Sequence, residues 1–205
     1  RLLHGQRIRP LRRLTLGIIG LGRIGQQVAR RMAPSVGEVI AHDPYLDPTK
    51  AAALGVALVE LPDLLARADI VSVNCPLTPE TRHLLNRDTL AMMKPDALLV
   101  NTARGPIIDG GALAIALAEG PLAAAAIDVF EEEPLPMDDP LAALPNLVMT
   151  PHAAYYSEES AETIRRETLQ AVLDVLRGRE PIVTANPDVL KRLTLAPRAD
   201  ATIWG

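Results

Sequence analysis

Residues 14–25 read LTLGIIGLGRIG, an apolar run followed at once by three glycines in the pattern G-x-G-x-x-G. The run predicts a buried strand, and the residues from Ile24 to Met32 predict the helix that follows it. In this setting Gly20 would form a tight turn, Gly22 would let a ligand approach the backbone, and Gly25 would let the helix pack on the strand. Backbone N–H groups at the start of such a helix bind phosphate, so the stretch predicts a pyrophosphate-binding turn.

Apolar runs and helical patterns alternate along most of the chain. This alternation predicts an α/β fold of the Rossmann type, a doubly wound parallel sheet with helices on both faces. The expected strands are 14–19, 38–42, 70–74, 97–101, 124–129 and 147–149. The expected helices are 24–32, 48–54, 61–66, 87–92, 110–119 and 158–177.

The expected domain organisation has three parts. Residues 1–152 would form the nucleotide-binding domain, 153–180 a segment carrying the last helix, and 181–205 an irregular tail. Ser157 would cap the last helix and Gly178 would follow its end. The acidic, proline-rich stretch 131–140 is expected to be a loop.

Composition excludes several classes of protein. The chain has 205 residues, of which 48% are apolar and 22% charged, and its net charge is −4. This balance argues against nucleic acid as a partner, and the apolar runs are too short to predict a membrane span. Cys75 is the only cysteine, which excludes a disulfide framework and a cysteine-based zinc site. A reducing, cytoplasmic setting is expected.

An acidic residue supports the reading of the glycine turn as a dinucleotide site. Asp43 ends the second expected strand, 18 residues after Gly25, where an acid binds the adenosine ribose in dinucleotide-binding folds. A carboxylate there repels a 2′-phosphate, which favours NAD over NADP. The alternative is a purely structural turn, with Asp43 capping the bend at Pro44.

Residues just past the strand 70–74 lie at the edge where ligands bind in a doubly wound sheet. Thr81 would either bond the cofactor or cap a helix, and the sequence leaves both possibilities open. Cys75 has no basic neighbour that would lower its pKa, so a buried, inert thiol is expected.

Three further strand ends carry polar side chains suited to chemistry. Arg104 would face the cleft and bind a carboxylate with its guanidinium, or else pair with Asp109. Asp128 is an acid at an apolar strand end, where burial is costly without a partner, and it is therefore a cofactor-side candidate. Glu131 to Glu133 would be either a solvated loop or part of the site, and His152 either a structural residue or a proton shuttle.

Five motifs, in order, carry a resemblance to a known family. They are Leu16–Gly25, Asp43–Tyr45, Asn101–Gly105, Ala126–Phe130 with Glu133-Pro134, and Thr150–His152. In these motifs the chain resembles the D-isomer-specific 2-hydroxyacid dehydrogenases, from about Arg7 to about Arg179. The stretch His152–Glu158 is similar to the C-terminal-binding-protein branch, which usually carries Trp where Tyr155 stands.

The resemblance implies a mechanism and a cofactor. Arg104 would hold the substrate's carboxylate and carbonyl oxygen, His152 would exchange the hydroxyl proton, and Glu133 would pair with His152. Hydride would pass between the nicotinamide of NAD and C2 of a small 2-hydroxy or 2-oxo acid. The residues assigned to the cofactor site are Gly20, Gly22, Arg23, Ile24, Gly25, Asp43, Cys75, Pro76, Thr81, Thr102, Ala103, Arg104, Asp128, His152 and Ala154.

The family resemblance also sets two competing expectations for the whole chain. Members begin with roughly a hundred residues that form a separate substrate domain of ordinary size, and here that domain is expected to be largely missing. The chain would then be the cofactor-binding portion of a homodimeric dehydrogenase, with poor turnover by itself. The alternative is an NAD-responsive, dimerising interaction protein similar to the C-terminal-binding-protein corepressors.

Overall fold

The computed structural model describes residues 9–197. The chain divides into two compact units, Arg1–Ala154 and Tyr155–Gly205. The first unit holds the sheet. The second holds both the long helix and the tail, which the sequence analysis places in separate segments.

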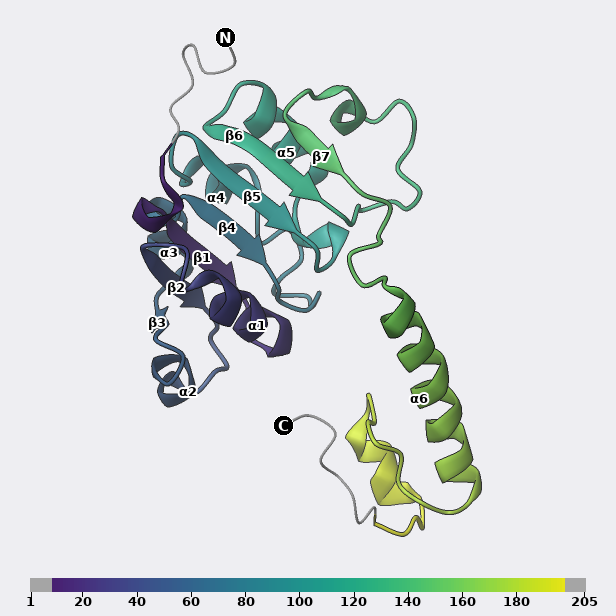
Figure 1. The fold of residues 1–205 in the computed structure, drawn as a ribbon. Coiled ribbons are helices and arrows are strands. Elements are labelled where there is room, and N and C mark those ends of the chain that lie inside the picture. The colour runs from purple at the N-terminus through teal and green to yellow at the C-terminus, as the bar shows by residue number, and fades with distance from the viewer. Residues whose placement is uncertain (1–8, 198–205) are drawn as a thin grey trace. The chain divides into compact units, whose positions relative to one another are not determined.

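The first unit is built on one seven-stranded sheet, in the order β3-β2-β1-β4-β5-β6-β7, with every pairing parallel (Figure 1). The strands are β1 (Thr15–Ile19), β2 (Glu38–His42), β3 (Ala57–Leu58), β4 (Ile70–Val73), β5 (Ala97–Asn101), β6 (Leu122–Ile127) and β7 (Leu147–Met149). The order changes direction between β1 and β4, as in doubly wound nucleotide-binding sheets. The predicted fold class is confirmed.

Four strands differ from the prediction. β1 begins one residue later and β4 ends one residue earlier than predicted, and β6 ends at Ile127 rather than Val129. β6 begins at Leu122 rather than Ala124, because Leu122 already pairs with Ala97 of β5 across an irregular register. β3 was not predicted, since its two residues are too few to show a periodic pattern.

The helices of the first unit are close to those expected. They are α1 (Arg23–Met32), α2 (Pro48–Ala52), α3 (Leu61–Arg67), α4 (Arg87–Ala91) and α5 (Gly110–Ala118), with short 3-10 turns η1 (Leu11–Arg13), η2 (Gly105–Ile107) and η3 (Pro140–Ala143). Side-chain caps fix several starts: Asn86 and Thr89 form a capping box at α4, and Asp109 accepts from Ala112 N at α5.

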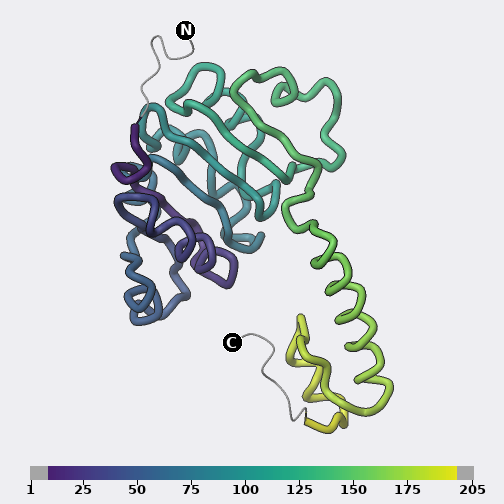
Figure 2. The backbone as a smooth tube through the Cα atoms, viewed as in Figure 1, coloured from purple at the N-terminus to yellow at the C-terminus, as the bar shows by residue number. Residues whose placement is uncertain are grey.

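Alternating side chains of β1 show that helices cover both faces of the sheet at this strand. Leu16 and Ile18 belong to a buried cluster with Ala29 of α1. Gly17, between them, faces α3, since a Cβ there would lie 2.7 Å from Leu64 Cδ2. Consecutive residues of a strand point to opposite faces, so α1 and α3 lie on opposite sides. In Figure 1, α4 and α5 lie behind the sheet, and Figure 2 gives the same path as a backbone tube.

One face of the β5–β7 half is exposed. Leu99 of β5 is fully buried in a cluster that includes Leu113 of α5. Its neighbour Leu98 points the other way and is 39% exposed, and Val148 of β7 is 64% exposed. The core of this half therefore lies on the α5 side.

The second unit contains α6 (Glu158–Leu176), which Ser157 caps in a capping box and which Gly178 follows at φ +72°, as predicted. The irregular arm predicted after Pro181 is wrong in part, because η4 (Pro187–Arg192) forms there and Ala196 N donates to Gly178 O. The rest of the predicted tail, 198–205, lies outside the described residues. No helix within residues 9–197 has the length and apolarity needed to cross a membrane.

Candidate active site

The glycine turn lies at the carboxyl end of β1, where the strand order reverses. Gly20 has φ +87°, and a Cβ on it would lie 2.6 Å from Cys75 Cα, so a side chain is excluded. A Cβ on Gly25 would lie 2.2 Å from Gly20 O, so α1 sits directly on the turn. A Cβ on Gly22 would meet nothing within 4 Å. Gly22 therefore leaves open space in front of the first amides of α1, which fits a bound pyrophosphate.

Asp43 is tied to this turn. Its Oδ2 accepts from Leu21 N at 2.8 Å and its Oδ1 accepts from Tyr45 N at 3.1 Å. The turn-capping contact considered in the sequence analysis is thus present, and the same carboxylate also faces the glycine turn. A cavity of about 180 Å³ lies here, lined by Gly20, Asp43, Pro76 and Thr81 among others. Gly20, Asp43, Pro76 and Thr81, which the sequence assigns to the cofactor site, therefore line one cavity.

Thr81 holds the loop after β4 rather than starting a helix. Its Oγ1 donates to Pro76 O at 2.7 Å and accepts from Thr78 N at 2.8 Å. The helix-capping alternative is wrong, because residues 79–83 form turns and α4 begins later, at Arg87. Cys75 is buried, and burial raises the pKa of its thiol to about 11, as expected for an inert cysteine.

Arg104 projects from the end of β5 into solvent. The buried Asn101 shapes this bend, since its Oδ1 accepts from Ala103 N and its Nδ2 donates to Arg104 O. Asp109, the alternative ion-pair partner, instead caps α5. Arg104 Nη1 donates to Ala103 O at 2.6 Å. Arg104 is exposed at the carboxyl edge of the sheet.

His152 and Glu133 form a pair. His152 Nδ1 lies 2.8 Å from Glu133 Oε2, and Glu133 Oε1 accepts from Phe130 N at 2.9 Å. These contacts, first that with His152 and then that with Phe130, lower the pKa of Glu133 below its ordinary value. A cavity of about 600 Å³ adjoins the pair and is lined mainly by apolar side chains such as Leu135 and Met149. The solvated-loop alternative does not describe Glu133, which has two specific partners.

Asp128 holds the backbone around His152. His152 has φ +53°, in the left-handed region that only a few per cent of non-glycine residues occupy. Its N donates to Asp128 O at 2.8 Å, while the Asp128 carboxylate accepts from Ala153 N at 2.8 Å and Ala154 N at 2.9 Å. Thr150 Oγ1 donates to the same carboxylate. The buried acid thus finds its partners within the chain and fixes the turn that carries His152.

Because it accepts these hydrogen bonds, the ionised carboxylate of Asp128 stabilises the folded protein. Burial alone would raise its pKa, but the contacts from Thr150, Ala154 and Ala153 bring the pKa below the ordinary value. The contribution of Asp128 to the free energy of unfolding is therefore fully present above about pH 4. It is lost as the pH falls through the lower folded-state pKa.

We expect Asp128→Asn to destabilise the protein by about 2–3 kcal/mol at neutral pH. The two backbone N–H groups donate to different carboxylate oxygens, and in asparagine one of these becomes an NH2 group that cannot accept. The difference from the wild type should shrink at about pH 2.5. Urea unfolding at both pH values measures it, with the exposed Asp138→Asn as the control. An equal difference at both pH values would contradict the assignment.

Two residues of this region were missed from the sequence. Thr150 donates a hydrogen bond to Asp128, and in the sequence only its position at the end of a strand indicates a role. His83 pairs with Glu131, with Nε2 and Oε2 2.8 Å apart, although nothing in the sequence around His83 predicts a role for it. The contact spans 48 residues, and no local pattern reports it.

The remaining assigned residues lie at the same sheet edge. Arg23 and Ile24 open α1 and are exposed, Thr102 and Ala103 follow β5, and Ala154 follows His152. β5 and β6 are neighbours, so Arg104 and Glu133 arise from adjacent strand ends.

Residues 3–154 match the family model of the D-isomer specific 2-hydroxyacid dehydrogenase, NAD binding domain. The chain belongs to this family. It is 47% identical over 165 residues to the D-3-phosphoglycerate dehydrogenase of Methanocaldococcus jannaschii, covering 80% of this chain and 31% of the relative. It is 43% identical over 181 residues to the glyoxylate reductase of Aeropyrum pernix, covering 88% of this chain and 54% of the relative.

A solved structure of the family has the same fold. The D-lactate dehydrogenase from Aquifex aeolicus, complexed with NAD and lactic acid, superposes with a TM-score of 0.77 at 34% identity. The match covers 86% of this chain and 59% of that one. The chain thus spans between about a third and three fifths of the length of the relatives it matches.

Proposed function

We propose that this chain supplies the cofactor-binding and acid–base portion of an NAD-dependent D-2-hydroxyacid dehydrogenase acting on a small 2-hydroxy or 2-oxo acid. One observation carries the proposal. A paired histidine and glutamate, His152 and Glu133, lie at the same sheet edge as the glycine turn that ends β1. Family membership supports the reaction class.

The residues around the glycine turn fit NAD. The open space at Gly22 and the first amides of α1 would receive the pyrophosphate, and Asp43 would accept from the adenosine ribose. When bound, NAD supplies the hydride chemistry. The protein binds and orients the cofactor.

His152 would exchange the substrate's hydroxyl proton through Nε2. Its Nδ1 faces the Glu133 carboxylate, which orients the ring and stabilises the imidazolium formed when the proton is taken. The lowered pKa of Glu133 keeps that carboxylate ionised at neutral pH. Glu133 is therefore assigned the orienting role and His152 the acid–base role.

Arg104 would bind the substrate's carboxylate and carbonyl oxygen. A guanidinium presents parallel N–H groups that match a carboxylate in two hydrogen bonds. The exposed side chain at the end of β5 is placed on the edge that the cofactor site also uses.

Titration with NADH, followed by its fluorescence, tests the proposal. We expect saturable binding with a Kd on the order of micromolar, and weaker binding of NADPH because Asp43 repels a 2′-phosphate. Asp43→Ala should weaken NADH binding about 10-fold and should reduce the preference for NADH over NADPH. The exposed Glu60→Ala is the control. A folded wild type without saturable NADH binding would refute the proposal.

The relatives named above are dehydrogenases and reductases, and they give no support to the corepressor-like alternative. The homodimer and the cytoplasmic setting stay predictions from the sequence.

A further inference from the structure

The short segment after β6 determines where Glu133 lies. Residues 131–139 contain no helix or strand, so backbone hydrogen bonding within an element does not fix Glu133. After β6 the chain passes close to Gly105. A Cβ added to Gly105 would clash with the carbonyl group of Phe130. The start of the segment is therefore held against the loop that follows Arg104.

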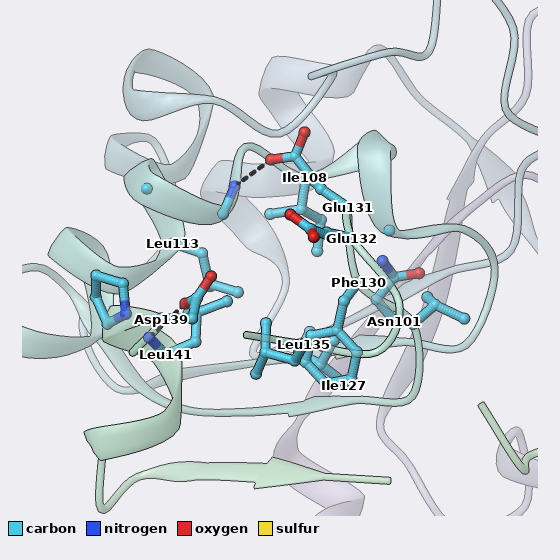
Figure 3. Close-up of a pocket in the computed structure, with 15 residues that line it drawn as sticks. Asn101, Ile108, Leu113, Ile127, Phe130, Glu131, Glu132, Leu135, Asp139 and Leu141 are labelled. Atoms are coloured by element: carbon cyan, nitrogen blue, oxygen red, sulfur yellow. Dashed lines mark hydrogen bonds between the residues drawn. The ribbon is translucent and has the colours of Figure 1, made fainter. Parts of the chain in front are cut away.

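Glu131 anchors the same segment two residues before Glu133. Its Oε1 accepts from Gly110 N, the first residue of α5, at 2.9 Å (Figure 3). Its Oε2 lies 2.8 Å from His83 Nε2. An ionised carboxylate only accepts, so His83 is the donor. One side chain thus ties the segment to the start of α5 and to the turn before α4.

His83 is itself held from both sides. Its N donates to Pro106 O at 2.8 Å, and its O accepts from Asn86 Nδ2 at 3.1 Å. Its φ is +51°, the left-handed region, as for His152. A strained backbone at a polar residue persists only where its surroundings enforce it, and such residues cluster at functional sites.

From these contacts we infer that His83 is a positioning residue: through Glu131 it places Glu133, and thereby the imidazole of His152. This inference rests on the proposed roles of Glu133 and His152. The pair is half exposed, at 40% for His83 and 39% for Glu131, so it contributes little to stability. Its effect lies in the geometry of the segment.

Two substitutions of His83 separate positioning from folding. His83→Asn tolerates the left-handed backbone but is too short to reach Glu131. His83→Gln keeps an N–H donor near the position of Nε2. The measurement is the pKa of Glu133, followed by the carboxyl ¹³C resonance in a pH titration. The charged groups that act on Glu133 are His152, which lowers its pKa, and Asp128, which opposes it.

We expect the pKa of Glu133 to rise toward its ordinary value in His83→Asn, because the contact with His152 loosens, and to stay low in His83→Gln. Glu131→Gln loses one of its two acceptor contacts and should also raise the pKa of Glu133. This variant replaces His83→Asn in the test if His83→Asn does not fold. An unchanged Glu133 pKa in both His83→Asn and Glu131→Gln would overturn the inference. The titration uses no NADH, so a wild type that fails to bind NADH would defeat the proposed function without altering this result.

Discussion

Gly25→Ala is expected to destabilise the protein by about 3 kcal/mol and to abolish NADH binding. The new Cβ would lie 2.2 Å from Gly20 O, a backbone atom that cannot move without shifting the turn. α1 would have to separate from β1, which removes the phosphate-binding amides from their position. Urea unfolding followed by circular dichroism gives the stability, and NADH fluorescence gives the affinity.

Gly22→Ala is the matched control at the start of the same helix. Its Cβ meets nothing within 4 Å, so the free energy of unfolding should change by less than about 1 kcal/mol. NADH affinity should still fall about 10-fold, because the methyl group occupies the space assigned to the pyrophosphate. If Gly22→Ala binds NADH like the wild type, the pyrophosphate does not lie over this turn.

His152→Asn is expected to lower the rate of 2-oxo acid reduction by about 10³-fold, the usual contribution of a general acid. Asparagine accepts the φ of +53° at this position, so the loss should come from the missing imidazole and not from strain. Turnover of glyoxylate and hydroxypyruvate at high protein concentration measures the rate.

Neighbouring glutamates provide the control for this assignment. Glu133→Gln keeps the size of the side chain and removes the charge that stabilises the imidazolium, so it should slow turnover about 10²-fold. Glu132→Gln, an exposed neighbour in the same segment, should leave turnover unchanged. Equal rates for both variants would show that the pairing with His152 has no catalytic role.

The sheet could be predicted almost completely, because the strands of a parallel sheet appear as nearly continuous apolar runs. This holds even for β5 and β7, which are exposed on one face. β2, β5 and β7 begin and end where the sequence analysis places them. The exceptions are elements defined by pairing. β3 exists because two residues pair with β2, and the start of β6 is set by Ala97 of the neighbouring strand.

The polar contacts of the site were only partly predictable. The glycine turn follows from residue types, since only glycine fits a φ of +87° beside Cys75. The sequence marks Asp128 as costly to bury but not which groups compensate it, because Ala153 and Ala154 donate through their backbones, which any residue shares. The bond between His83 and Glu131 depends on two distant loops meeting.

The order of the sheet also has a consequence during protein synthesis. β1 lies inside the sheet between β2 and β4, yet both these neighbours come later in the chain, and β4 ends only at Val73. At about 5–20 residues per second, the nascent β1 waits a few seconds for its second neighbour. Its Leu16, Ile18 and Ile19, each at most 2% exposed in the folded protein, are then uncovered. Until β4 is synthesised, this strand exposes apolar surface of the kind that chaperones cover on nascent chains.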